Sequence, residues 1–240
     1  RCPPWRRRLF FRIGVAFENS FIPKIHDTLP SLKIIDTRKN VPLRRMEGHH
    51  HHGHDGHDAH DGHGSHDNLH DDEGYDPHVW LDPQRVKIQA RTIADALVQA
   101  DPAGQETYET NLAAFLTELD DLDGKIRQIL EPVTGRTFMV FHPSWGYFAD
   151  AYGLHQEPIE MEGKDPSARY LARIIDTARS ENIRVIFVQP QFSRSKADAV
   201  AAAINGTVLT IDPLARNYIE NLESAAHAIR DALTTQKDQQ

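Results

Sequence analysis

The sequence predicts an α/β fold in which parallel strands are covered by helices. Short apolar runs alternate with segments of helical periodicity through the C-terminal half, which is typical of a parallel sheet with helices on both faces. A chain of 240 residues with 39% apolar content can bury such a core. The apolar runs are too short to cross a bilayer, which predicts a soluble protein. The expected elements are strands at 137–141, 184–188 and 207–211, and helices at 144–152, 167–182, 194–205 and 218–233.

The N-terminal region carries the pattern of one βαβ unit. Residues 10–15 and 33–36 are short apolar runs, and residues 18–29 between them have mixed helical signals. A unit of this size cannot bury both faces of a sheet by itself. The arginines at 6–8 look like the start of a signal peptide, but Arg12 interrupts the apolar stretch that follows. We expect roughly the first eight residues to lie outside the fold of an N-terminally incomplete chain.

Two helices are expected in the middle of the chain, at residues 84–99 and 103–130. The second has apolar residues at steps of three or four, which form one stripe of an amphipathic helix. At 1.5 Å per residue it would extend for about 40 Å, a length that suits a rigid connector between lobes. The stripe consists of Tyr108, Leu112, Phe115, Leu119, Leu122, Ile126 and Ile129.

Residues 48–74 form a segment rich in His, Asp and Gly. It has ten His, six Asp, one Glu and no Lys or Arg, so it holds −7 of the net charge of −8. Without apolar periodicity it is predicted to be a solvated loop, and ten imidazoles favour weak capture of several metal ions over a tag or an acidic linker. The ions should be lost as His protonates below about pH 6.5. The histidines are His49, His50, His51, His52, His54, His57, His60, His63, His66 and His70.

Composition also restricts the partners and the metal ligands. A net charge of −8 argues against nucleic acid as a partner, because phosphate binding needs a surplus of Lys and Arg on one face. The single cysteine, Cys2, excludes zinc sites built from several thiolates. Any metal site must therefore use His, carboxylate or water.

Polar side chains follow three of the expected strands directly. His142, Gln189 and Asp212 take these positions, and ligands of parallel α/β sheets bind outside the carboxyl ends of the strands. His78 lies in a turn motif from which a loop could carry it to the same edge. Two imidazoles and a carboxylate suit Zn²⁺ or Mn²⁺. The structural alternatives are a capping or surface role for each His, and an Asx turn at Asp212 before Pro213.

Four motifs in chain order carry a resemblance to a known family. The chain resembles the zinc/manganese solute-binding proteins of bacterial ABC importers, the cluster A-I or zinc-uptake type. An acidic His-rich loop before the first motif is also typical of the zinc members. The motifs are Asp-Pro-His-Val-Trp-Leu-Asp-Pro at 76–83, Phe-His-Pro-Ser-Trp-Gly-Tyr-Phe at 141–148, Gln-Pro-Gln-Phe-Ser at 189–193 and Ile-Asp-Pro-Leu at 211–214.

The resemblance implies two α/β lobes with parallel sheets, joined by a long backbone helix, with one metal held in the cleft. His78, His142 and Asp212 match family ligands, and Glu160, Glu162 and the strand-end Gln189 are expected as cleft neighbours. The first His ligand of the family lies upstream of this sequence, so we expect an incomplete N-lobe, weaker metal binding and uncovered apolar surface. The expected organisation is 1–47 as N-lobe remnant, 48–74 as loop, 75–101 as end of the N-lobe, 102–131 as connecting helix and 132–240 as C-lobe.

The function that follows is capture of Zn²⁺, with Mn²⁺ as the other candidate, outside the cytoplasmic membrane in the periplasm. The expected partner is an ABC-type permease in that membrane, and the chain is expected to be a monomer that catalyses no reaction. One alternative is a zinc hydrolase, because two His and one Asp with an open water position can also activate water. The other is a metal buffer in which only the His-rich loop matters.

Overall fold

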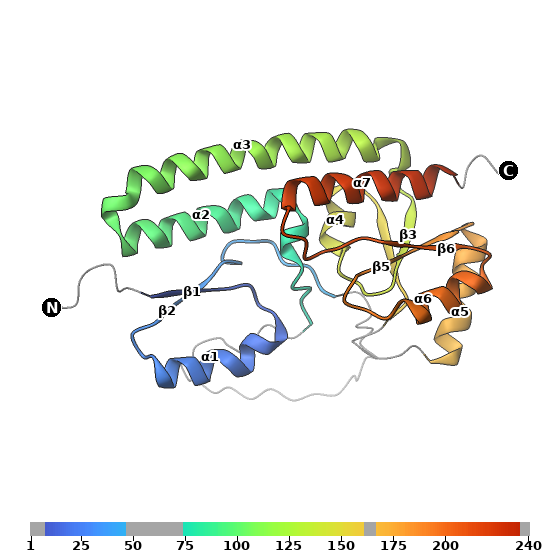
Figure 1. Ribbon diagram of the computed structural model, residues 1–240, viewed down its shortest axis with the longest axis horizontal. Helices are drawn as coiled ribbons and strands as arrows, with labels where there is room; N and C mark the ends of the chain where they lie inside the picture. Colours follow the sequence, from blue (N-terminus) through green and yellow to red (C-terminus); the bar gives the residue numbers. More distant parts are fainter. Residues whose placement is uncertain (1–7, 47–73, 161–166, 236–240) are drawn as a thin grey trace, which may run out of the picture.

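The computed structural model describes residues 8–46, 74–160 and 167–235. These residues form two parallel β-sheets, one of two strands and one of four. The long helix α3 (Gln105–Leu130) runs past both sheets, as Figure 1 shows. The predicted α/β fold with parallel sheets and a long helix is therefore confirmed. In the described part of the chain, no helix combines the length and the apolar character needed to cross a membrane.

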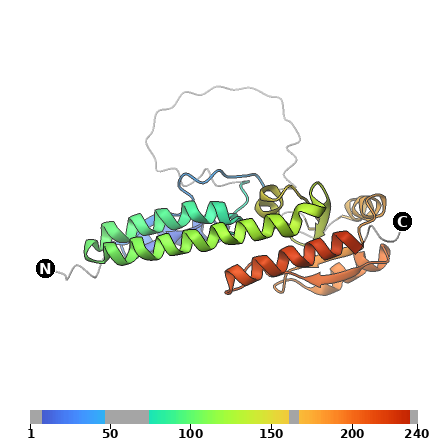
Figure 2. The same cartoon turned by 90° about the horizontal axis from the view of Figure 1, so that it is seen from above.

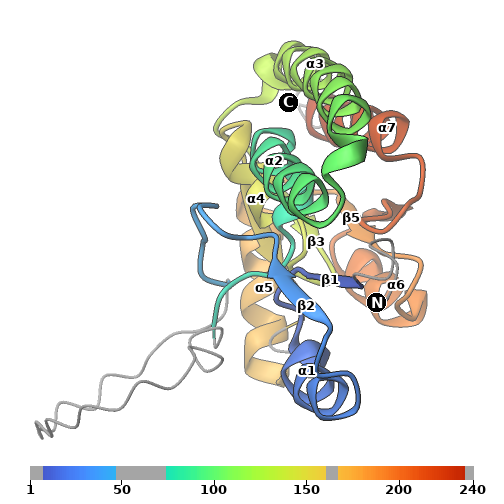
Figure 3. The same cartoon turned by 90° about the vertical axis from the view of Figure 1, so that its left-hand side faces the viewer.

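The two-stranded sheet is the middle layer of three. Strands β1 (Leu9–Arg12) and β2 (Lys33–Asp36) pair in parallel and are connected through α1 (Ala16–Thr28), which forms the predicted βαβ unit. In the end-on view of Figure 3, this sheet lies between α1 on one side and the helix pair α2 (Pro83–Ala100) and α3 on the other. The first helix begins two residues earlier than the sequence pattern suggested.

Helix α3 connects the two parts of the molecule by packing along a different helix in each. Figure 2 shows it beside α2 in its first half and beside α7 (Tyr218–Thr235) in its second half. The predicted apolar stripe supplies the contact, since Leu119, Leu122 and Ile126 are buried. One continuous helix thus fixes the N-terminal layers relative to the C-terminal sheet.

The four-stranded sheet has apolar side chains on both faces, as expected for a parallel sheet between helices. Alternate residues of β3 enter two different cores: Phe138 packs with α4 and α7 on one face, and Met139 packs with α5 and α6 on the other. The strand order is β4–β3–β5–β6. The strands are β3 (Thr137–Val140), β4 (His155–Pro158), β5 (Val185–Val188) and β6 (Thr207–Thr210), and the remaining helices are α4 (Gly146–Ala151), α5 (Ala168–Ser180) and α6 (Arg194–Ala203).

The structure differs from the sequence prediction next to β3. Strand β4 was not predicted, because its sequence His-Gln-Glu-Pro has no apolar alternation and ends in Pro158. It forms the edge of the sheet, where a proline and exposed polar residues are tolerated. Helix α4 was expected over residues 144–152 and is shorter, because it begins only at Gly146.

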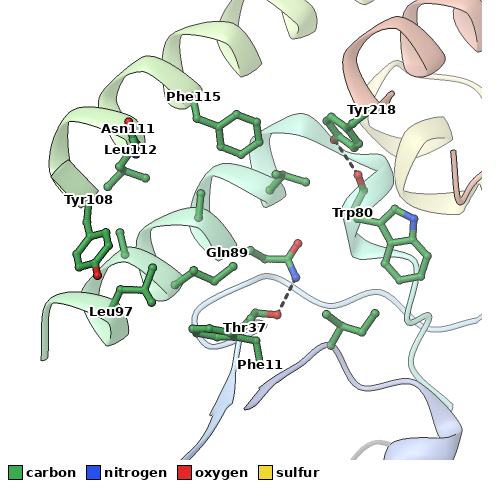
Figure 4. A pocket seen from close by; sticks show the side chains of 15 residues that line it. Phe11, Thr37, Trp80, Gln89, Leu97, Tyr108, Asn111, Leu112, Phe115 and Tyr218 are labelled. Atoms are coloured by element: carbon green, nitrogen blue, oxygen red, sulfur yellow. Dashed lines mark hydrogen bonds between the residues drawn. The ribbon is translucent and has the colours of Figure 1, made fainter. Parts of the chain in front are cut away.

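An apolar pocket of about 540 Å³ lies between α2, α3 and the two-stranded sheet (Figure 4). Phe11 from β1, Leu97 from α2, and Leu112 and Phe115 from α3 contribute to its wall. Apolar side chains of β1 and of the long helix α3 therefore line this pocket. Trp80 closes the end that faces the C-terminal half of the chain, where Tyr218 donates a hydrogen bond to its carbonyl (2.8 Å).

Candidate metal site

Two imidazoles from distant parts of the sequence face each other at the carboxyl end of β3. His142 follows this strand, and His78 lies directly before the 3₁₀ turn Val79–Leu81. Their ring centroids are 5.4 Å apart, with the rings edge to face at 76°. The structure thus brings together two of the three predicted ligands.

Each imidazole has a buried carboxylate within hydrogen-bonding distance of its Nδ1 atom. Asp76 Oδ1 is 2.7 Å from Nδ1 of His78, and Glu160 Oε2 is 3.3 Å from Nδ1 of His142. A carboxylate accepts only, so Nδ1 carries the proton and Nε2 keeps its lone pair. Histidines that bind metals usually have such a partner, which fixes the tautomer and the ring orientation. Each imidazole therefore keeps its Nε2 lone pair available to a ligand.

Burial keeps His142 in its neutral, metal-binding form. Burial and, to a smaller extent, the neighbouring His78 lower the pKa of His142 to about 4, while Asp76 opposes the shift. The ring also stacks on Phe192, at 4.9 Å between centroids. Protons therefore compete little for this nitrogen near neutral pH.

The backbone of His142 is anchored by Gln189, the residue that follows β5. Its side-chain amide donates to the carbonyl of His142 (2.8 Å) and to Ser144 Oγ (2.9 Å). Gln189 is almost fully buried, at 1% exposure. The structure thus places Gln189 behind His142 as a support. Glu160, which packs against the His142 ring, was predicted as a neighbour of the site.

Asp212 follows β6 as predicted, but its carboxylate is engaged in local contacts. Oδ1 accepts hydrogen bonds from the Leu214 backbone N–H (2.9 Å) and from Gln191 Nε2 (3.0 Å). The first of these is the Asx turn that the sequence offered as the structural alternative. Over residues 8–46, 74–160 and 167–235, no three His, Cys, Asp or Glu side chains form a group able to hold a metal ion. A metal role for Asp212 stays a prediction.

Two groups of predicted residues lie outside the described residues. These are Glu162 and the ten histidines from His49 to His70. The chain on either side of the His-rich segment is described, and its two ends are adjacent: Arg45 and Tyr75 form an antiparallel bridge, and the Met46 N–H donates to the carbonyl of Gly74 (2.9 Å). The second end leads within a few residues to His78.

Two functional residues were missed by the sequence analysis. Asp76 stands in the quoted motif, two residues before His78, and a carboxylate at that spacing was a usable signal for a partner of the ring. Arg44 pairs with Asp76 at 3.0 Å but lies 32 positions away in the chain. Its local sequence gave no sign of this contact.

The comparisons with known proteins assign the family. The family model for the zinc-uptake complex component A periplasmic proteins, ZnuA, matches residues 7–232. The chain belongs to this family. The resemblance drawn from the four motifs is therefore confirmed.

Similar proteins are found among curated sequences and solved structures. The high-affinity zinc uptake system protein ZnuA of Bacillus subtilis is 31% identical over 170 residues, which covers 66% of this chain and 53% of that protein. A crystal structure of ZnuA is 38% identical with a TM-score of 0.80, covering 93% of this chain and 78% of that one. A ZnuA deletion mutant with zinc bound is 39% identical with a TM-score of 0.80, covering 94% and 78%. The chain spans about half the length of the curated relatives it matches.

The family consists of binding proteins for zinc uptake and not of enzymes. The zinc hydrolase alternative is therefore not supported. Zinc is the ion of these relatives, since they are named for its uptake and one neighbouring structure contains it.

Proposed function

We propose that this chain captures Zn²⁺ outside the cytoplasmic membrane as the binding-protein component of an ABC importer, with His78 and His142 as ligands. The observation that carries the proposal is the pair of facing imidazoles, each with a carboxylate on Nδ1. Two Nε2 donors held by buried partners suit a tetrahedral ion that is completed by further ligands or water. Asp212 is the proposed third ligand, and Mn²⁺ is the other ion that such a His–carboxylate set could take.

The proposal extends to the location and the partners of the chain. Membership of a periplasmic zinc-uptake family supports the periplasm as its place of action and an ABC-type permease as the acceptor of the ion. We propose that it acts as a monomer, with residues 48–74 concentrating ions near the site. The proposed domain organisation keeps the five parts expected from the sequence. These are the N-lobe remnant at 1–47, the loop at 48–74, the end of the N-lobe at 75–101, the connecting helix at 102–131 and the C-lobe at 132–240.

The experiment must separate the His78–His142 site from the ten loop histidines. We therefore define the loop-silenced chain as the full chain in which each of these ten histidines is replaced by Asn. Zinc affinity is measured by competition with a chromophoric chelator. The loop-silenced chain should keep one zinc site, and His142→Ala should weaken it by more than the about 10–100-fold that loss of a ligand's supporting partner costs.

The matched control is His155→Ala, which removes an exposed imidazole from the first position of β4. It should leave the affinity unchanged. If the loop-silenced chain binds no zinc while the unmodified chain binds several ions weakly, the chain is a His-loop buffer and the proposed site is wrong. An unchanged affinity in His142→Ala would equally contradict the assignment.

A further inference from the structure

A buried ion pair lies directly behind His78. Asp76 has a fully buried side chain, and it uses its two oxygens for different partners. Oδ1 faces Nδ1 of His78 at 2.7 Å and also accepts the His78 backbone N–H at 2.9 Å. Oδ2 accepts a hydrogen bond from Nη1 of Arg44 at 3.0 Å. The guanidinium thus determines which carboxylate oxygen is left to hold the imidazole.

Arg44 is itself held by helix α4 of the C-terminal half. Its Nε donates to Asp150 Oδ2 at 2.9 Å, and its backbone N–H donates to Oη of Tyr147 at 3.0 Å. The Tyr147 hydroxyl in turn donates to the Asp76 carbonyl at 3.0 Å. Arg44 is therefore fixed at both its backbone and its side chain. The Asp76 carboxylate that pairs with it cannot rotate freely.

The space for the guanidinium depends on a glycine. A Cβ atom at position 146 would overlap the Arg44 guanidinium and reach within 3.0 Å of Asp76 Oδ2. Gly146 opens helix α4, in the motif that follows His142. The absence of a side chain there lets the cation approach the buried carboxylate.

We propose that Arg44 is a positioning residue for the zinc ligand His78, acting through Asp76. This inference rests on the proposed function of the site. A buried carboxylate without its cationic partner is costly, so loss of Arg44 removes the contact that orients the Asp76 carboxylate toward His78. His78 then loses its fixed ring orientation and its single tautomer, and zinc affinity falls with them. Arg44 does not touch the ion.

Arg85 provides a matched comparison for this role. It also places its guanidinium over the ring of Tyr147, at 4.8 Å from the centroid against 5.9 Å for Arg44, and it also pairs with an aspartate, Asp82. Asp82 is instead the N-cap of helix α2, where its Oδ1 accepts a hydrogen bond from the Gln84 backbone N–H. Replacing Arg85 therefore removes the same charge and a similar ring contact without affecting the support of His78.

The test uses the loop-silenced chain as parent, with the variants Arg44→Met, Arg44→Lys, Gly146→Ala and Arg85→Met. Arg44→Met and Gly146→Ala should weaken zinc binding by about 10–100-fold, the effect expected from loss of an outer-shell partner. Arg44→Lys should recover part of the loss, because it restores the charge but not the two-pronged geometry. Arg85→Met should bind as the parent does. Gly124→Ala is the control for Gly146→Ala, since a Cβ at position 124 meets nothing within 4 Å.

A second measurement follows the tautomer of His78 by nitrogen-15 NMR in the zinc-free chain. The parent should show a proton on Nδ1 only, and Arg44→Met should show a mixture of tautomers. Parent-like affinity in Arg44→Met, or an equal loss in Arg85→Met, would overturn the inference. If Arg44→Met does not fold, Gly146→Ala decides. If the parent binds no zinc, the proposed function fails, and the tautomer still tests the path from Arg44 to His78.

Discussion

Acidification of the zinc-free chain should destabilise it through His142. The imidazole is mostly buried, with 24% of its side chain exposed, and its pKa is lowered from 6.5 to about 4 by burial and by His78. Between these two values the unfolded chain binds the proton and the folded chain does not. Protons therefore favour the unfolded state, and the stability that is complete above pH 6.5 declines as the pH falls toward 4.

The size of this effect follows from the two pKa values. One pKa unit corresponds to about 1.4 kcal/mol, so the difference between 6.5 and about 4 corresponds to about 3 kcal/mol of unfolding free energy. The comparison is with His142→Gln, which fills a similar space and does not titrate. Subtracting its stability at each pH removes the contribution of other groups that titrate in the same range.

The assay is urea unfolding in the presence of a chelator, followed by far-UV circular dichroism from pH 7 to pH 4. The free energy of unfolding of the parent, minus that of His142→Gln, should fall by about 3 kcal/mol across this range. Parallel curves for the two proteins would refute the reasoning, because they would show that His142 titrates alike in the folded and unfolded chains.

Three further outcomes are expected. Asp76→Asn should weaken zinc binding by about 10–100-fold in chelator competition, because the amide keeps the shape but removes the charge behind His78; an unchanged affinity would argue against that support. Phe187→Ala, at a buried side chain, should lower the free energy of unfolding measured in urea by about 3–5 kcal/mol. Leu209→Ala, at an exposed side chain, should lower it by less than about 0.5 kcal/mol, and similar losses in the two variants would contradict the core described above. Asp212→Asn should weaken zinc binding if Asp212 is a ligand. An affinity equal to that of the parent would show that Asp212 serves the Asx turn and does not bind the ion.

The core of the C-terminal sheet was predictable because its strands are buried on both faces. Such strands are continuous apolar runs, and residues 185–188 match β5. Strand β4 escaped prediction because an edge strand needs no apolar run. Its sequence is accepted for its backbone hydrogen bonds to β3, and these have no signature in side-chain hydrophobicity.

The place of His142 was predictable for a topological reason. The carboxyl ends of parallel strands meet at one edge, so His142 could be placed from its position directly after a strand. The support of His78 could not be predicted in the same way. Arg44 reaches Asp76 only because the chain returns to the same place before and after residues 47–73. Contacts between residues so far apart in the sequence follow from the tertiary fold and not from any local pattern.

The two proposed ligands differ in what fixes their positions, and this difference bears on how the site would release an ion. His142 directly follows a buried strand, and Gln189, which directly follows the neighbouring strand β5, holds its backbone. His78 stands in irregular chain, so its place depends on side chains from elsewhere: Arg44 through Asp76, and Trp80, whose Nε1 donates to the Pro213 carbonyl at 2.8 Å. Such a segment opens at a lower free energy than a core strand. We therefore expect the His78 side of the site to be the one that yields when the ion is released.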